Sequence, residues 1–230
     1  MRSISLFLLS FLLVIPMAVA QQEVNAFDAE GKRHGVWKKN FPGSRQLRYQ
    51  GQFEHGKEVG TFKFYCEDCG DQPILVKEFE ANSDKATLNY YTSNGRLEST
   101  GEMHGKEKTG TWTYFHKDGS TPMVVENYEN DLLEGPKVTY YADGSVTEEV
   151  TYVNGKREGE SRYYSPAGVE IKFFTYKNDM LNGPVKYYDA KGNLLINGNY
   201  KDDVKHGLWQ YYEGGKLQKE ERFPKPNRQD

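Results

Sequence analysis

The stretch Gly110-Thr111-Trp112-Thr113-Tyr114-Phe115-His116-Lys117-Asp118-Gly119 contains the pattern that decides the fold of this chain. Trp112 and Tyr114 are separated by one residue, and two threonines alternate with them. Because successive side chains of a β-strand point to opposite faces, this alternation predicts a strand with one aromatic and one mainly polar face. Asp118 and Gly119 then provide the residue types that tolerate positive φ, as a tight hairpin turn requires.

The same pattern recurs along most of the chain, and returns almost unchanged as Gly207-Leu208-Trp209-Gln210-Tyr211-Tyr212-Glu213-Gly214-Gly215. A glycine opens each unit, and successive opening glycines are 25, 50, 25, 24, 24 and 24 residues apart. The interval of 50 contains a unit that lacks its glycine, with the remains Leu88-Asn89-Tyr90-Tyr91-Thr92-Ser93-Asn94-Gly95, so we expect eight units. The opening glycines are Gly35, Gly60, Gly110, Gly135, Gly159, Gly183 and Gly207.

A second alternating segment follows the turn in each unit. One example contains Val146, Val150 and Tyr152, and it ends at the next turn signal, Asn154-Gly155. Two strands joined by a tight turn make a β-hairpin, and hairpins repeated at a fixed period make an array. We therefore predict an all-β fold, an elongated single-layer antiparallel meander of fifteen or sixteen strands.

The ends of the chain differ from the repeats. Residues 1–20 hold one charge at Arg2, an apolar run and a small-residue ending at Ala20, which is the layout of a secretory signal peptide. A retained membrane anchor would need a longer apolar span. We expect a signal peptide at 1–20, a lead-in at 21–30, the repeat domain at 31–223 and a tail at 224–230. The expected location is the periplasm or the extracellular space.

The charge balance points away from nucleic acid. The formal net charge is -3, and removing Arg2 with the signal peptide makes it -4. No cluster of Lys and Arg indicates a nucleic-acid or anionic-lipid surface. We expect no nucleic-acid partner and no transmembrane segment after signal removal.

The motif Cys66-Glu67-Asp68-Cys69 is the sharpest local signal. In an exported protein, two cysteines at a hairpin tip predict a disulfide between Cys66 and Cys69. A redox motif of this kind normally begins a helix, and a zinc site would need a second ligand pair. Free thiols, metal binding and redox chemistry are the less favoured alternatives.

The histidines and carboxylates recur with the repeat. The histidines stand in or next to the turns, which indicates turn geometry, although equivalent positions of stacked units approach each other closely enough for a metal site as a less favoured alternative. Carboxylates recur just before opening glycines and predict a solvated edge rather than a paired catalytic site. With no nucleophile elbow or phosphate loop, the sequence predicts no enzyme, no metal and no cofactor. The residues in question are His34, His55, His104, His116, His206, Glu58, Glu107, Glu134 and Glu158.

The aromatic face is the remaining candidate site. Cross-strand aromatic pairs stabilise a sheet by roughly 0.2 to 1 kcal/mol each, which is a purely structural role. A single-layer sheet has nothing obvious to cover such a face, so either the sheet curls to cover it or a partner does. The predicted binding face contains Trp37, Phe62, Phe64, Tyr90, Trp112, Tyr114, Tyr140, Tyr163, Tyr187, Trp209 and Tyr211.

The run Tyr152-Val153-Asn154-Gly155-Lys156-Arg157-Glu158-Gly159, followed by Tyr163-Tyr164, resembles the MORN (membrane occupation and recognition nexus) repeat. It is most similar to the bacterial variant found in proteins labelled YwqK-family antitoxins. The resemblance extends from Gly31 to about Phe223. It implies a meandering sheet of hairpins that binds proteins or lipids rather than catalysing a reaction.

These observations support three hypotheses about function. The first is an exported, non-catalytic scaffold that binds a protein partner, still unidentified, through its aromatic face. The second is an antitoxin or immunity protein that acts outside the cytoplasm on an exported toxin. The third is binding of a cell-envelope glycan, because sugar rings stack on aromatic side chains.

Overall fold

The computed structural model describes residues 23–225, and these residues form a single antiparallel β-sheet without a helix. The predicted signal peptide and the last residues of the predicted tail lie outside the described part of the chain. No described segment forms a helix of the length and hydrophobicity that a membrane crossing needs.

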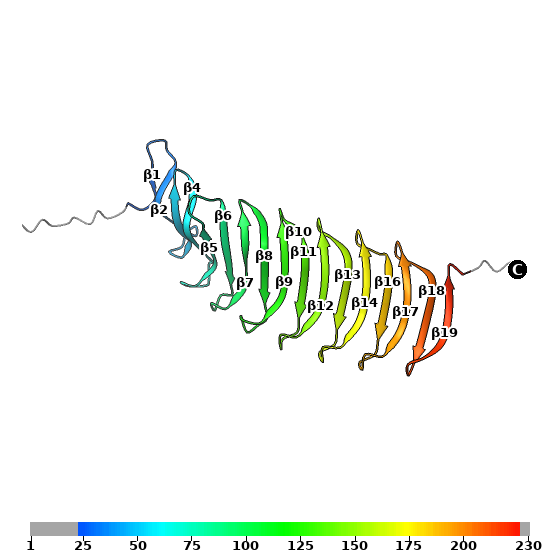
Figure 1. The fold of residues 1–230 in the computed structure, drawn as a ribbon. Coiled ribbons are helices and arrows are strands. Elements are labelled where there is room, and N and C mark those ends of the chain that lie inside the picture. The colour runs from blue at the N-terminus through cyan, green and yellow to red at the C-terminus, as the bar shows by residue number, and fades with distance from the viewer. Residues whose placement is uncertain (1–22, 226–230) are drawn as a thin grey trace, which may run out of the picture.

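The strands follow one another in chain order from one end of the sheet to the other (Figure 1). Three of the nineteen, β1, β10 and β15, have only two residues. The other sixteen agree with the fifteen or sixteen strands that the repeat pattern predicts. The strands are β1 (Ala26–Phe27), β2 (Arg33–Asn40), β3 (Leu47–Glu54), β4 (Lys57–Tyr65), β5 (Pro73–Phe79), β6 (Lys85–Tyr91), β7 (Leu97–His104), β8 (Glu107–Phe115), β9 (Pro122–Glu129), β10 (Leu132–Leu133), β11 (Gly135–Tyr140), β12 (Val146–Val153), β13 (Lys156–Tyr164), β14 (Glu170–Lys177), β15 (Met180–Leu181), β16 (Gly183–Tyr188), β17 (Leu194–Lys201), β18 (Val204–Glu213) and β19 (Lys216–Phe223).

The predicted fold class is confirmed, and Figure 1 shows one open layer with β1 and β19 at opposite ends. One feature of the lead-in was not predicted. Its strand β1 pairs with β2 through Ala26 and Phe27, opposite His34 and Arg33. The lead-in therefore adds an edge strand to the first hairpin.

The opening glycines mark breaks in the strand register. Gly110 has a φ of 62°, and the register between β7 and β8 shifts between Thr100 and Glu102, near this residue. A residue with a Cβ is disfavoured at such a φ, whereas glycine adopts it without a steric penalty. The recurring glycine therefore reflects a bulge that each unit repeats.

Three of the most buried core residues are aromatic rings that lie on glycines of the preceding strand. Trp112 of β8 covers Gly101 of β7 so closely that a Cβ on this glycine would be 2.1 Å from the indole Cδ2. The indole Nε1 donates a hydrogen bond of 3.0 Å to the Glu102 carbonyl, and the Lys108 ammonium lies 4.4 Å from the ring centroid on the same indole. With only 2% of its surface exposed, Trp112 is buried in a sheet that has no second layer.

The pairing of a large with a small or complementary side chain recurs at a separation of eleven residues. Trp209 covers Gly198, and Phe62 covers Gly51, in the same way. Where the residue two places after the opening glycine is not aromatic, the residue paired with it is not a glycine. The other pairs are Lys77 with Leu88, Glu126 with Lys137 at 2.9 Å, Val150 with Ser161, and Phe174 with Val185, which follow the register of their strands.

The turns between β9 and β10 and between β14 and β15 lie at the strand ends away from the turn of Asp118, and they connect each unit to the one before it. The Asp131 carboxylate accepts a hydrogen bond of 2.7 Å from the Lys108 N–H, and the Asp131 N–H donates to the carbonyl of the same residue. Asp179 makes the same pair of bonds with Arg157. The Glu134 carboxylate accepts the N–H of Asn154 in the following turn at 2.7 Å, as Glu158 does for Asn178 at 2.8 Å. Glu134 and Glu158 therefore each bind the backbone of the following turn, in addition to lying at the solvated edge that the sequence predicts.

The pairing of Gly101 with Trp112 predicts strong energetic coupling. We expect Gly101→Val to destabilise the protein by roughly 1–3 kcal/mol through overpacking, and Trp112→Ser by roughly 3–5 kcal/mol through loss of the buried ring. The double variant recreates the natural combination Val150 and Ser161, so it should lose at least about 1 kcal/mol less than the sum of the single changes. Urea unfolding of the four proteins measures this difference, and strict additivity would contradict the prediction.

The turn carboxylate of Asp118 predicts a dependence of stability on acid pH. The Thr121 hydroxyl, then the N–H groups of Ser120 and Thr121, hold the pKa of Asp118 at about 2. Because this folded-state pKa lies below the unfolded value of about 3.9, the stabilisation is complete above about pH 4 and is lost as pH falls toward 2. The variant Asp118→Asn should show a smaller loss of the urea midpoint across this window than the original chain. The variant Thr121→Val should reduce the loss of the urea midpoint in part. Equal losses in the original chain and in Asp118→Asn would show that Asp118 does not contribute.

Candidate functional site

The rings of the predicted binding face divide into two rows on one face of the sheet. The side chains two residues after each opening glycine form an inner row. In this row Phe62, Trp112 and Trp209 are buried and unavailable for direct contact with a partner. Trp37, at the N-terminal end of that row, is half-buried. The fourth position forms an outer row of half-buried rings, here called the ring row: Phe64, Tyr90, Tyr114, Tyr163, Tyr187 and Tyr211.

The placement of Tyr140 on this face was wrong. Lys137 forms an ion pair with Glu126, whose strand position is opposite Trp112, so Lys137 lies on the face of the inner row. Tyr140 is three residues further along the same strand and therefore projects from the opposite face. It corresponds to Phe115, the second member of the aromatic pair, because each is the last residue of its strand before the turn.

Lysine side chains connect the two rows. Lys108 Nζ donates to the Tyr114 hydroxyl at 2.9 Å while it lies over the Trp112 ring. Lys205 does the same for Tyr211, at 3.2 Å, and lies 4.0 Å from the centroid of Trp209. The face is therefore a mosaic of phenol edges and ammonium groups over a buried aromatic layer.

Three tyrosines of the ring row have a raised pKa. Burial raises the pKa of Tyr90 and Tyr187, and burial followed by the Glu148 carboxylate raises the pKa of Tyr163. Neutral phenols can donate and accept hydrogen bonds, and their rings offer apolar surface. Such side chains suit the recognition of another macromolecule.

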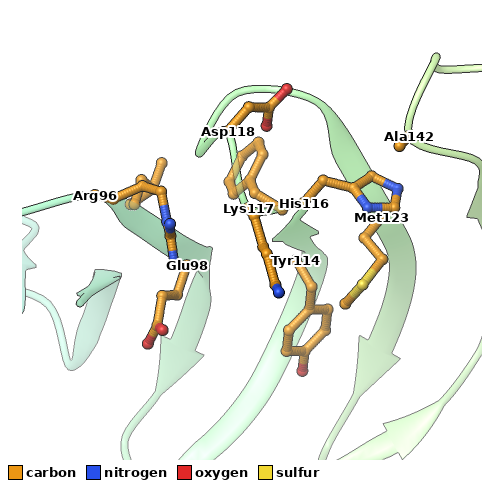
Figure 2. Close-up of a pocket in the computed structure, with 10 residues that line it drawn as sticks. Arg96, Glu98, Tyr114, His116, Lys117, Asp118, Met123 and Ala142 are labelled. Atoms are coloured by element: carbon orange, nitrogen blue, oxygen red, sulfur yellow. The ribbon is translucent and has the colours of Figure 1, made fainter.

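A groove of about 740 Å³ lies where the ring row meets the turns (Figure 2). In Figure 2, the side chains of Tyr114 and Met123 lie near each other, and Glu98 and Arg96 project from the neighbouring strand region. Met123 is 39% exposed. The His116 ring is held by a hydrogen bond of 3.1 Å from its Nε2 to the Tyr140 carbonyl. With both charges and apolar groups, the groove can accept a side chain or a short segment of a partner.

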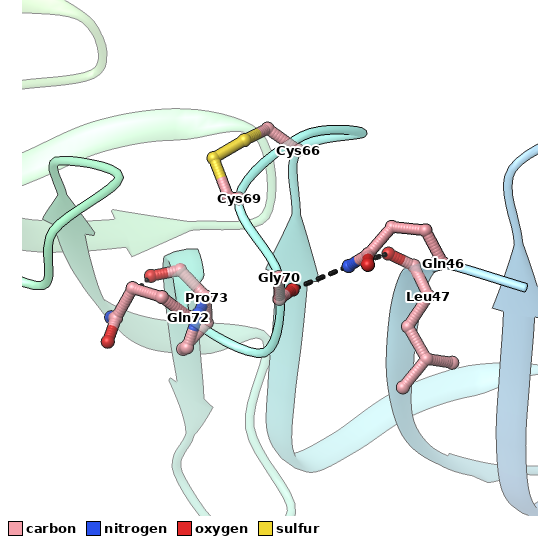
Figure 3. The surroundings of a disulfide bond; sticks show 7 residues. All are labelled: Gln46, Leu47, Cys66, Cys69, Gly70, Gln72 and Pro73. Carbon is pink, nitrogen blue, oxygen red and sulfur yellow. Dashed lines mark hydrogen bonds between the residues drawn. A yellow bond between two sulfur atoms is a disulfide. The ribbon is translucent and has the colours of Figure 1, made fainter.

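A disulfide joins Cys66 to Cys69 in the turn between β4 and β5, with the two Cα atoms 5.3 Å apart (Figure 3). Gln46, from the turn between β2 and β3, donates a side-chain hydrogen bond to the Gly70 carbonyl. The disulfide and this hydrogen bond thus hold two successive turns in place. Neither sulfur is available as a nucleophile or ligand in this state.

The sequence interpretation missed the residues that cover the buried rings. A basic residue stands two positions before the opening glycine in several units, and its cation lies over an aromatic ring. Arg157 does so over Tyr176 at 4.2 Å, and Arg33 over Trp37 at 5.0 Å. The recurring spacing was visible in the sequence and is the signal that would have found these residues. The four are Arg33, Lys108, Arg157 and Lys205.

Comparisons with known proteins agree with the fold. The family model described as MORN repeat variant matches residues 133–154, 181–202 and 205–223, which lie in units of the C-terminal half. A comparison with curated proteins finds no match. MORN repeats generally form non-enzymatic scaffolds. The chain therefore carries repeats of the MORN repeat variant at these three positions.

Proposed function

We propose that this protein is an exported, non-catalytic scaffold that binds a protein partner through the ring row. The observation that supports this most directly is that one side chain from each of six units is half-exposed at the same position of the same face. The inner row is already covered by lysines and neighbouring rings, so on this face of the sheet the ring row is the aromatic surface left for contact.

The spacing of the ring row favours an extended partner. Each unit contributes two long strands, and strands lie about 4.8 Å apart, so equivalent rings recur about every 10 Å along the sheet. A partner that lies across several units makes the same contact several times, and each contact adds to the affinity. Tyrosine is enriched among the residues that dominate protein interfaces.

The charges on this face favour a protein over a neutral glycan. The ammonium groups of Lys108 and Lys205 lie beside the ring row, and exposed Lys172 lies next to Tyr163. Lys219 lies next to Tyr211 and forms an ion pair of 3.0 Å with Glu221. A protein surface supplies both the apolar groups and the carboxylates that complement such a mosaic. An exported toxin is one specific case of such a partner.

The ring row can be tested with two matched triple variants. We expect Tyr163→Thr, Tyr187→Thr and Tyr211→Thr together to weaken partner binding at least about tenfold, because three contact rings are lost. Thr139 occupies the equivalent position in another unit, so the substitution suits the strand. The partner is captured from the cell envelope with the original chain and identified, and its dissociation constant is then measured with each variant.

The control changes the neighbouring rings on the opposite face. Tyr164, Tyr188 and Tyr212 are equally half-buried, so the same substitutions there remove similar rings from similar strand positions. The control should bind the partner as tightly as the original chain. Equal loss of binding in both triple variants would contradict the proposal. Capture of peptidoglycan instead of a protein by the original chain would also contradict it.

Export has its own test. When the gene is expressed in its own cells, we expect the purified mature chain to begin at Gln21 and to fractionate with the periplasm or the medium. Mass spectrometry of the intact protein measures the cleavage position. A chain recovered from the cytoplasm with residues 1–20 attached would rule out export. The proposal that the ring row binds a partner would not be affected by that result.

A further inference from the structure

Two histidines and one aspartate meet at the N-terminal end of the sheet. Asp28 follows β1, His34 lies in β2, and His55 lies in the turn between β3 and β4. One potential ligand atom from each side chain lies within 4.8 Å of the other two. The imidazole rings have centroids 5.0 Å apart.

The aspartate is fixed before any ligand arrives. Its Oδ1 accepts hydrogen bonds from the N–H groups of Glu30 and Lys32, at 3.0 and 2.8 Å. Its Oδ2 lies 2.8 Å from Nδ1 of His55. The carboxylate side chain is only 10% exposed, so the turn holds one oxygen in place and directs the other toward the histidines.

The turn that contains residue 55 needs a residue that tolerates a positive φ, but it does not need an imidazole side chain. His55 has a φ of 47°, and the corresponding turn of a later unit has Asn154 with a φ of 49°. Asparagine tolerates this conformation better than histidine, so turn geometry alone would favour the asparagine. The side chain of His55 is 63% exposed, so its ring can turn from its contact with Asp28 without displacing packed neighbours.

We propose that Asp28, His34 and His55 form a binding site for one divalent transition-metal ion of the zinc type. Zinc binds imidazole nitrogen and carboxylate oxygen at about 2.0–2.2 Å, which places tetrahedral ligands about 3.3 Å apart. Rotation of the two exposed histidines closes the gap from the present separations. The N–H groups that hold Asp28 act as the outer shell that orients a metal ligand, and the fourth position is open to water.

Such an ion would secure the lead-in to the repeat array. The strand β1 is held to β2 by the pairs at Ala26 and Phe27, and by the hydrogen bond of 3.0 Å from Trp37 Nε1 to the Ala26 carbonyl. The three ligands come from the lead-in, the first strand and the following turn. A bound ion therefore adds a link among three segments that backbone hydrogen bonds already join, including those from Asn25 N–H to the Val36 carbonyl and from Gly56 N–H to the Arg33 carbonyl.

The test is a calorimetric titration of Zn²⁺ alone into the purified chain, produced without a histidine tag. We expect one ion per chain, and at least about tenfold weaker binding for His34→Thr and for His55→Asn. These replacements are the residues that stand at the corresponding places of other units, Thr109 and Asn154, so the fold should tolerate them. Absence of binding, or equal affinity in the original chain and both variants, would overturn the proposal.

Two controls separate this site from adventitious binding to exposed histidines. His206 is the counterpart of His34 before the last opening glycine, and His104 precedes a glycine in another turn. Among the described residues, neither belongs to a group of three potential ligands, so His206→Thr and His104→Asn should leave the affinity unchanged. Weakening by these controls equal to that by His34→Thr would refute a specific site.

A second measurement tests what the ion does. Zn²⁺ should slow amide hydrogen exchange in residues 25–32 of the original chain and leave it unchanged in His55→Asn. Binding without this protection would contradict the role of the ion in securing the lead-in.

Discussion

The structure depends on an aromatic ring lying flat on a strand that has no side chain at that point. Globular domains bury hydrophobic groups between two layers, but this sheet has one layer and must bury them within it. Gly101 lets the indole of Trp112 approach the backbone of the neighbouring strand, and the Lys108 ammonium lies over the same ring. Backbone, ring and cation together replace the missing second layer, and the pair Gly198 and Trp209 repeats the arrangement in the last unit.

Much of the fold was predictable because its determinants are local. Alternation, turn residues and a fixed period all lie within about 25 residues, and the hairpins pair only with sequence neighbours. The face of Tyr140 was not predicted correctly, because the aromatic pair in that unit is Tyr140 and Tyr141, and the turn begins at Tyr141 rather than after it. Counting from Gly135 gives the correct face, since the strand phase is set by the bulge at the opening glycine and not by the aromatic residues.

The candidate site was predictable in outline only. The pattern placed the rings on one face, but it did not distinguish rings that hold the sheet from rings that remain accessible. That distinction depends on which atoms cover each ring, and the covering atoms belong to other strands. Trp112 is covered by Lys108 and supported by Gly101, whereas Tyr114, two residues later, is half-exposed. A face of hydroxyl, ammonium and ring edges follows from this division, and it suits contact with another protein.

The turns that reach back to the preceding unit make the array modular in a specific sense. Asp131 binds the backbone of a strand 23 residues earlier and Asp179 that of a strand 22 residues earlier, close to one repeat length. Removal or duplication of the segment between two opening glycines, such as Gly159 and Gly183, would reconnect strands of the same type and keep every side chain on its face. Gain or loss of a whole unit is therefore a conservative change in the evolution of this scaffold, in contrast to an insertion of one residue within a strand. The reach of the scaffold could then change in steps of about one hairpin width, with its surface chemistry preserved.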